Sequence, residues 1–162
     1  MPQVIITVGL PGSGKTTWAE QYVNSHDHAV HMNKDTIRAM LFAGRGWTRT
    51  QEEFVCKIRD ENLCSALSDG YSVIIDDTNL DPKHIIGIQT LVGVSPVHIH
   101  DFTDVSLEIC MERNRVRLDK QPLHDETILM MHRKYFEDGK WKYWEQFMSK
   151  EKIMPHEEEA SS

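Results

Sequence analysis

The residues most clearly suited to chemistry lie at positions 9–16, which have the spacing G-x-x-x-x-G-K-[ST]. In this pattern the glycines let backbone N–H groups point at phosphate oxygens, and the first turn of the next helix adds partial positive charge. Lys15 can reach the β- and γ-phosphates of a nucleoside triphosphate, and the Thr16 hydroxyl can bind Mg²⁺. The expected ATP-binding residues of this segment are Gly9, Pro11, Gly12, Ser13, Gly14, Lys15, Thr16 and Thr17.

Two carboxylates, Asp76 and Asp77, follow a second apolar run. An acid at the end of a buried strand holds the Mg²⁺ shell in phosphate-loop enzymes, so we expect Asp76 to act with Thr16 at the metal. The next residue is Thr78, and not the glutamate that would activate water in a motor-type ATPase. The guanine-binding pattern Asn-Lys-x-Asp also fails, because its nearest match at 33–36 ends in threonine. Both observations favour a phosphotransferase.

Asp35 and Arg38 indicate an acceptor site, because they lie three residues apart at the start of a predicted helix and share one face. The strand before them ends at the carboxyl edge of the sheet, where ligands bind. A kinase needs a base that takes the proton of the acceptor hydroxyl, and Asp35 is well placed for that role. The same spacing fits a surface ion pair without a function, and spacing alone leaves both interpretations open.

Four apolar runs predict the strands that position these residues, at 3–9, 28–32, 71–76 and 96–102. Two of them do not alternate, which is typical of strands buried on both faces, whereas the last alternates and is expected nearer an edge. Helices are predicted at 15–24, 34–42, 51–68, from 82 onwards, around 107–110 and at 125–136. The alternation of strands and helices predicts an α/β domain with a central, mostly parallel sheet of about four strands.

Capping residues indicate where the helices begin. The expected caps are Asn33, Thr50 with Glu53 as a capping box, Asp81 before a first-turn Pro82, and Asp104. Each helix after a strand is thereby predicted to begin close to the carboxyl edge of the sheet.

Length and charge narrow the class of protein. The 162 residues predict one domain over 1–138, with 139–162 as an aromatic and then acidic tail. The aromatic part of the tail, Trp141, Trp144 and Phe147, is expected to pack on the domain or to form a homo-oligomer. The net charge of −7 argues against a basic coat that wraps duplex nucleic acid, yet it allows a local cationic pocket.

Targeting signals are not evident in the sequence. No apolar run approaches the roughly 20 residues of a membrane helix, and the first residues do not resemble a signal peptide. We therefore expect a cytoplasmic protein without a membrane partner. Its cysteines, Cys56, Cys64 and Cys110, are expected to be reduced and buried.

Four segments carry a more specific pattern: residues 9–18, Asn33-x-Asp35-x-x-Arg38, Asp77-Thr78-Asn79-Leu80-Asp81-Pro82 and Arg113-Asn114-x-x-Arg117. Over about residues 3–136 the chain resembles the kinase domain of phage polynucleotide 5′-kinase/3′-phosphatase. The resemblance implies a P-loop phosphotransferase fold with an arginine-bearing lid. It also implies transfer of the γ-phosphate of ATP, with Mg²⁺, to the 5′-OH of single-stranded or end-exposed DNA or RNA.

The same resemblance implies a role for each matching residue. Asp35 is expected to be the general base, Arg38 to bind the phosphate 3′ of the acceptor nucleoside, and Arg117 to contact the donor phosphates from the lid. Arg113 is expected beside Arg117 at the ATP, and the segment Asp77, Thr78 and Asn79 is expected to line the acceptor channel. If the chain is encoded by a phage, the expected location is the host cytoplasm.

The chain also departs from the family pattern. Lys34-Asp35-Thr36 stands where the family often has Arg-Asp-Asp, although the base position survives. The glycine-flexed loop at 44–49 could guide a strand or stack on a base through Arg45, Trp47 or Arg49, or serve only as a connector. Arg115 and Lys120 fit either a cationic lid or a solvated turn. The phosphatase motif Asp-x-Asp-Gly-Thr does not occur, so a kinase without 3′-phosphatase activity is expected.

Two other functions remain open on the sequence. A P-loop kinase of a small metabolite or antibiotic would share the donor site and differ in its acceptor pocket. A nucleotide-binding regulatory module would hydrolyse ATP only incidentally. Acceptor-stimulated turnover of ATP separates the regulatory module from the two kinases, and the identity of the acceptor separates the kinases.

Overall fold

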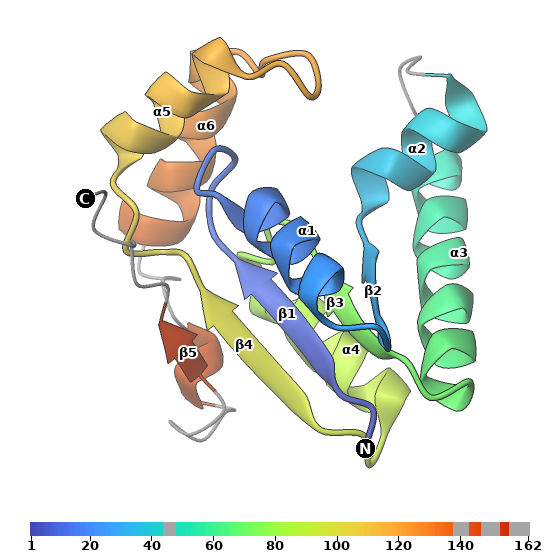
Figure 1. The fold of residues 1–162 in the computed structure, drawn as a ribbon. Helices are drawn as coiled ribbons and strands as arrows, with labels where there is room; N and C mark the ends of the chain where they lie inside the picture. Colours follow the sequence, from blue (N-terminus) through green and yellow to red (C-terminus); the bar gives the residue numbers. More distant parts are fainter. Residues whose placement is uncertain (44–47, 138–142, 147–152, 156–162) are drawn as a thin grey trace.

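Five parallel strands form the sheet of the computed structural model, which describes residues 1–43, 48–137, 143–146 and 153–155 (Figure 1). The strands are β1 (Val4–Val8), β2 (Ala29–Met32), β3 (Ser72–Ile75), β4 (Val97–Asp101) and β5 (Ile153–Pro155). Their order is β2-β3-β1-β4-β5, and every pairing within these ranges is parallel. The four predicted strands are confirmed. Strand β5 was not predicted; it has three residues and pairs with the end of β4.

Helices lie on both faces of the sheet, with α1 in front of it and α4 behind it in the view of Figure 1. The helices are α1 (Lys15–Ser25), α2 (Lys34–Phe42), α3 (Arg49–Ser68), α4 (Pro82–Val92), α5 (Leu107–Val116) and α6 (Asp125–His132). The helix predicted over 125–136 changes at Arg133 into a π-helical turn, Arg133–Glu137. A 3₁₀ turn follows at Tyr143–Gln146. The predicted α/β architecture with a parallel sheet is confirmed.

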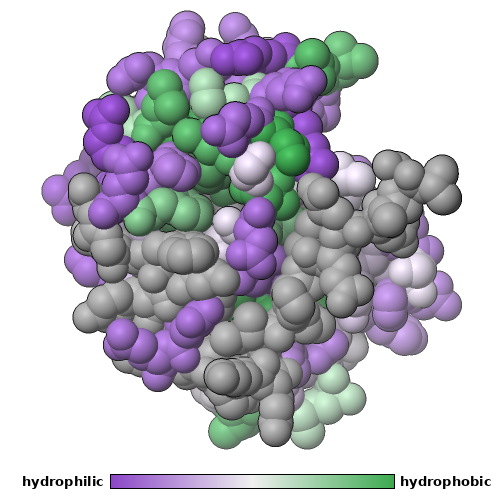
Figure 2. All heavy atoms as spheres, turned by 90° about the vertical axis from the view of Figure 1, so that its left-hand side faces the viewer, coloured by the Kyte–Doolittle hydropathy of each residue, from purple (hydrophilic) through white to green (hydrophobic). Residues whose placement is uncertain are grey.

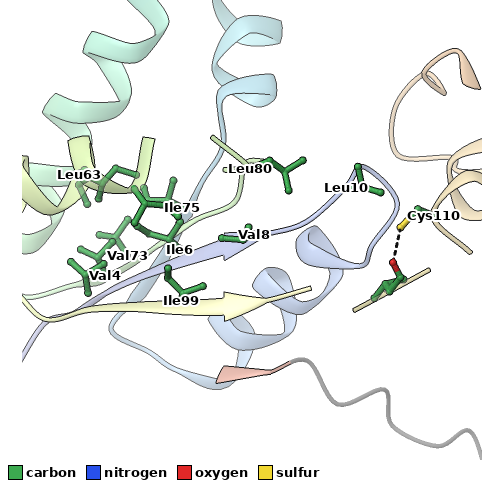
Figure 3. Close-up of a cluster of buried hydrophobic side chains, with 14 of the residues drawn as sticks. Val4, Ile6, Val8, Leu10, Leu63, Val73, Ile75, Leu80, Ile99 and Cys110 are labelled. Atoms are coloured by element: carbon green, nitrogen blue, oxygen red, sulfur yellow. Dashed lines mark hydrogen bonds between the residues drawn. The ribbon is translucent and has the colours of Figure 1, made fainter. Parts of the chain in front are cut away.

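Alternate side chains of the central strands enter two separate cores, one on each face of the sheet. The larger core contains Ile6 and Ile75 together with Leu63 of α3, all fully buried (Figure 3). The smaller core joins Ile5 and Ile74 to Ala19 and Trp18 of α1. Full burial of one such aliphatic side chain contributes about 1.5–3 kcal/mol, so these contacts fix the carboxyl ends of β1 and β3 side by side.

Side chains cap the first turns of α2 and α4. Asn33 accepts a hydrogen bond from the Thr36 N–H at 2.7 Å, and Asp81 accepts one from the Lys83 N–H at 3.0 Å, so both predicted caps are confirmed.

The predicted starts of α3 and α5 are wrong. Helix α3 begins at Arg49, because Thr48 and Gln51 form a complete capping box two residues before the predicted one. Both pairs have the spacing that a capping box requires, and Glu52 lies in the first turn of the helix. Helix α5 is capped by Ser106 rather than Asp104, since the Ser106 hydroxyl accepts from the Ile109 N–H at 3.3 Å.

The surface around α5 and α6 mixes apolar and hydrophilic side chains. Figure 2 shows hydrophobic residues interleaved with hydrophilic ones on the upper part of this face. Val116, Leu118 and Met130 are all exposed, and Leu118 is 99% exposed. The segment between the two helices, residues 117–124, therefore keeps its place through polar contacts more than through apolar packing.

The three cysteines are free thiols. Cys110 is buried as predicted, whereas Cys56 is only partly buried and Cys64 is exposed, so the prediction that all three are buried is wrong. The predictions for Arg45, for Trp47 and for the aromatic and acidic tail rest on side chains outside the part of the chain that is described here.

Candidate active site

A cleft of about 850 Å³ opens at the carboxyl edge of the sheet. Its walls come from the loop between β1 and α1, the start of α2, the residues after β3, and the segment from the end of α5 into α6. Among the sequence-predicted site residues, the cleft is lined by Pro11, Gly12, Gly14, Lys15, Thr16, Thr17, Asp35, Arg38, Asp76, Asp77, Thr78, Arg113 and Arg117. The structure therefore brings most of the predicted donor and acceptor residues into one space.

The phosphate loop, residues 9–14, needs its glycines for two different reasons. Gly12 and Gly14 have φ angles of 83° and 99°, a region that side chains with a Cβ rarely adopt. A Cβ on Gly12 would lie 2.3 Å from the backbone oxygen of Cys110, so the loop packs directly against α5. A Cβ on Gly9 would lie 2.7 Å from the Ser13 hydroxyl. Gly9 and Ser13 thus shape the loop from behind and do not line the cleft.

Lys15 folds back over this loop. Its Nζ donates to the carbonyl oxygen of Leu10 at 2.8 Å and to the Ser13 hydroxyl at 3.3 Å. Burial lowers the pKa of Lys15 from 10.5 to about 8, although the charge of Asp76 opposes this change. A buried ammonium with one carbonyl and one hydroxyl as partners is well suited to exchange them for phosphate oxygens.

Asp76 is the centre of a small polar cluster beneath the loop. Its Oδ2 accepts from the Thr16 hydroxyl at 2.7 Å and lies 2.9 Å from His31 Nε2. Burial alone would raise the pKa of Asp76, but the hydrogen bond from His31, the charge of Lys15 and the bond from Thr16 outweigh it and lower that pKa. The carboxylate is therefore ionised at neutral pH.

The Asp76 cluster also has the chemistry of a magnesium site. Hydroxyl and carboxylate oxygens are hard donors that suit Mg²⁺, and this ion usually takes only one or two protein ligands besides phosphates and water. Within the described ranges no three His, Cys, Asp or Glu side chains gather as a metal cluster. Thr16 and Asp76 fit the predicted role.

His31 is a site residue that the sequence did not reveal. It lies on β2, and the parallel register pairs it with Ile74, two residues before Asp76. Only the pairing of β2 with β3 brings the imidazole to the carboxylate. The signal in the sequence, a histidine two residues before the cap of a helix, was too weak to identify it.

The three residues after Asp76 have different roles. Asp77 Oδ1 accepts from the backbone N–H of Lys34 at 2.9 Å, and burial raises the pKa of Asp77. Thr78 lines the cleft. Asn79 is fully buried with φ of 46°, and its Nδ2 donates to the backbone oxygens of Thr7, Ile75 and Asp77. Asn79 therefore shapes the turn, and its side chain is not brought to the cleft as the acceptor assignment expected.

The acceptor residues Asp35 and Arg38 form a network with Glu52 of α3. Arg38 donates to Asp35 Oδ1 at 2.7 Å and to both carboxylate oxygens of Glu52 at 2.7 and 2.6 Å. The hydrogen bonds that Arg38 donates to Glu52 raise the pKa of Arg38. Glu52 also accepts from Lys34 Nζ at 3.3 Å. The sequence did not reveal Glu52 as a site residue, because its contact with Arg38 depends on the packing of α3 against α2.

Asp35, at the start of α2, also contacts the segment between α5 and α6. Its Oδ2 accepts from Lys120 Nζ at 2.7 Å, and its side chain is 58% exposed. Burial opposes ionisation of Asp35, but the hydrogen bond and charge of Lys120 and the charges of Arg38 and Arg117 prevail and lower the pKa of Asp35. An ionised carboxylate at the mouth of a phosphate-binding cleft can accept a proton from a hydroxyl.

The arginines of α5 and of the following segment are placed unequally. Arg113 and Arg117 line the cleft, and a Cβ on Gly14 would lie 3.8 Å from Arg113 Nη1. Arg117 donates to both carboxylate oxygens of Asp119 at 2.9 and 2.8 Å. Arg115 instead pairs with Asp125 on the outside. Arg113 and Arg117 thus share the cleft with the phosphate loop, and Arg115 does not line it.

The segment 117–124, which we call the lid, is anchored at its base by Asn114. This buried side chain donates to the carbonyl oxygen of Leu123 at 2.8 Å and accepts from its N–H at 3.1 Å. The two bonds join residues that are nine positions apart and thereby hold the lid at its base.

Comparison with known proteins identifies relatives of this chain. The family model described as an AAA domain matches residues 4–137. A candidate bifunctional polynucleotide kinase/RNA ligase of Autographa californica nuclear polyhedrosis virus is 30% identical over 88% of this chain and 22% of its own length. An L-seryl-tRNA(Sec) kinase of Methanococcus maripaludis is 28% identical over 88% of this chain and 56% of its own length.

A solved structure has the same fold. A chain of the Pnkp1/Rnl/Hen1 RNA repair complex superposes with a TM-score of 0.76 at 23% identity, over 91% of this chain and 46% of that one. The present chain thus spans less than two thirds of the length of each of these relatives. In the described residues, no helix is both long and apolar enough to cross a membrane.

Proposed function

We propose that this chain, which belongs to the AAA domain family and is a P-loop kinase, is an ATP-dependent polynucleotide 5′-hydroxyl kinase. The reaction transfers the γ-phosphate of ATP to the 5′-OH of DNA or RNA. The observation that carries the proposal is the position of Asp35 and Arg38, which line the same cleft as Lys15 and Thr16. The viral relative, 30% identical and named for a polynucleotide kinase, supports this class of acceptor.

The donor side holds the triphosphate. The phosphate loop and the N-terminus of α1 supply N–H groups, and Lys15 exchanges its bonds to Leu10 and Ser13 for phosphate oxygens. Arg113 and Arg117 neutralise charge on the transferred phosphoryl group from the opposite wall, once Arg117 gives up Asp119. Phosphoryl transfer proceeds mainly by such positioning and neutralisation.

Two residues of the donor side suit a metal ion. Thr16 and Asp76 would hold Mg²⁺, which neutralises phosphate charge when it is bound. His31 lies 2.9 Å from the same Asp76 oxygen that Thr16 contacts, and it helps to hold the carboxylate in place.

The acceptor side supplies a base and an anion contact. Asp35 takes the proton of the 5′-OH as that oxygen attacks the γ-phosphorus, and the bond to the β-phosphate oxygen breaks. Arg38, oriented by Glu52, binds the phosphate on the 3′ side of the reacting nucleoside. Thr78 and Asp77 line the passage between the two sides.

A second candidate is a P-loop kinase that phosphorylates a different hydroxyl. The relative named L-seryl-tRNA(Sec) kinase favours it, because it covers as much of this chain as the viral relative does. The donor site would be unchanged, and the acceptor would be a smaller alcohol or one carried on another molecule.

The test is transfer of label from γ-labelled ATP to a panel of acceptors. The panel contains a DNA and an RNA oligonucleotide with a 5′-OH, the same oligonucleotides with a 5′-phosphate, a free nucleoside, a nucleoside 3′-phosphate and a set of small alcohols. The proposal predicts label on the 5′-OH oligonucleotides, none on the blocked ones, and better use of the nucleoside 3′-phosphate than of the free nucleoside.

Two results would contradict the proposal. Label that enters only small alcohols favours the second candidate. Turnover of ATP that does not respond to any acceptor favours a nucleotide-binding regulatory module.

A further inference from the structure

One contact joins the lid to the acceptor side of the cleft. Lys120 Nζ donates to Asp35 Oδ2 at 2.7 Å, although the two residues are 85 positions apart in the sequence. The lid extends from the tops of α5 and α6 toward α2 (Figure 1). Since Leu118 beside it is almost fully exposed, polar contacts hold this segment. The ion pair therefore spans the mouth of the cleft.

The two oxygens of Asp35 are held with unequal strength. Oδ1 accepts from Arg38, which is itself fixed by two bonds to Glu52 and is only 19% exposed. Oδ2 accepts from Lys120, which is 41% exposed and whose ammonium pairs with Asp35 alone among the described residues. Arg38 is thus a fixed partner, and Lys120 is the partner that can be replaced.

We propose that Lys120 is a positioning residue of the transfer reaction, which holds the Asp35 carboxylate in place until the acceptor hydroxyl replaces the ammonium at Oδ2. The inference rests on the proposed function, because it assigns the acceptor hydroxyl to that oxygen. The hydroxyl proton then moves to Oδ2 while the acceptor oxygen forms its bond to the γ-phosphorus. The bond from that phosphorus to the bridging oxygen breaks, and its electron pair leaves with ADP.

The charges around Asp35 support this role. The groups that face it are Lys120 from the lid, Arg38 from its own helix, and Arg117 from the lid, and all three favour the ionised carboxylate over the opposing effect of burial. A base must be ionised to accept a proton. Without the ammonium of Lys120, the pKa of Asp35 would rise, and the carboxylate would stop acting as a base at a higher pH.

The experiment compares the pH dependence of kcat/KM for a 5′-OH oligonucleotide in the wild type and in Lys120→Gln. Arg115→Gln is the matched control, because it removes the same charge beside the same lid but pairs with Asp125 away from the cleft. Any general loss of attraction for a polyanion affects both variants alike. Lys120→Arg restores a cation at the same position.

The expected result is a shift of the acidic limb to higher pH in Lys120→Gln alone. On that limb, kcat/KM relative to its plateau should be about 2- to 5-fold lower than in the wild type, which corresponds to a partly exposed ion pair. Arg115→Gln and Lys120→Arg should keep the limb of the wild type. An unshifted limb in Lys120→Gln, or an equal shift in Arg115→Gln, would overturn the inference.

A second measurement separates this inference from the proposed function. The Asp35 carboxyl carbon can be titrated by NMR in the ligand-free wild type, Lys120→Gln and Arg115→Gln. A higher midpoint in Lys120→Gln alone supports the contact, and equal midpoints overturn it, whatever the acceptor is. If the wild type phosphorylates no 5′-OH end, the proposed function is contradicted. The titration then still tests whether Lys120 stabilises the ionised Asp35 carboxylate.

Discussion

Lys15 is expected to destabilise the ligand-free protein, and Lys15→Met should therefore raise its free energy of unfolding. The side chain is 7% exposed, and its burial lowers the pKa from 10.5 to about 8. A difference of 2.5 pKa units corresponds to about 3 kcal/mol at pH 7, where both the folded and the unfolded chain carry the charge. This is an upper bound, because methionine cannot replace the bond from Nζ to Leu10.

The pH dependence gives a sharper test than the single value. Between pH 8 and 10.5 the unfolded chain keeps the Lys15 proton and the folded chain has lost it, so the stability of the wild type rises with pH. The advantage of Lys15→Met should accordingly shrink from about 3 kcal/mol at pH 7 to about 1 kcal/mol at pH 10. Groups that do not interact with Lys15 titrate alike in the two proteins, so their contribution cancels in the difference.

Urea denaturation without nucleotide, in buffers free of phosphate, measures both quantities. Lys57→Met is the matched control, because Lys57 is 67% exposed and pairs with Glu61 on the same helix. Because Lys57 is exposed, Lys57→Met should change the free energy of unfolding at pH 7 far less than Lys15→Met does. If Lys15→Met is less stable than the wild type at pH 7, or if its advantage does not decline toward pH 10, the reasoning on Lys15 is refuted.

Three further predictions concern the loop, the acceptor network and the lid. Gly12→Ala should lower the free energy of unfolding by about 2–4 kcal/mol in urea denaturation. Gly87→Ala is the control and should raise it by about 0.5–1 kcal/mol, because a Cβ at Gly87 meets nothing within 4 Å. Similar values for the two variants would contradict the close packing of the loop. Glu52→Gln should release Arg38 and raise the acceptor KM about tenfold with a smaller change in kcat, and steady-state kinetics that show an unchanged KM would remove Glu52 from the acceptor site. Arg117→Ala should lower kcat about 10²-fold while calorimetry finds nearly unchanged ATP affinity, and intact transfer would exclude it from the donor site.

Much of the fold was predictable because local signals agree with the global arrangement. The phosphate loop follows a buried strand and precedes a helix, and the non-alternating runs around Ile5 and Ile74 correspond to strands with a core on each face. Strand β5 could not be predicted, because three residues carry no periodic pattern and gain their place only from pairing with β4.

The residues missed at the site depend on tertiary contacts. His31 reaches Asp76 only through the register of β2 on β3, and Glu52 reaches Arg38 only through the packing of α3 against α2. Asn79 was assigned to the acceptor by resemblance, but a positive φ angle turns its amide inward to the backbone. Sequence identifies residue types that can do chemistry, and packing decides which of them face the cleft.

The most direct test of the central claim compares Asp35→Asn with the wild type in nucleotide binding and in transfer to a 5′-OH oligonucleotide. Asp35 is 58% exposed and does not touch the phosphate loop, so the variant should fold and should bind a fluorescent ATP analogue with wild-type affinity. Removal of the base should lower the rate of transfer by about 10²–10⁴. Transfer at a near-wild-type rate by Asp35→Asn, with nucleotide binding intact, would contradict the assignment of this cleft as a kinase site with Asp35 as its base.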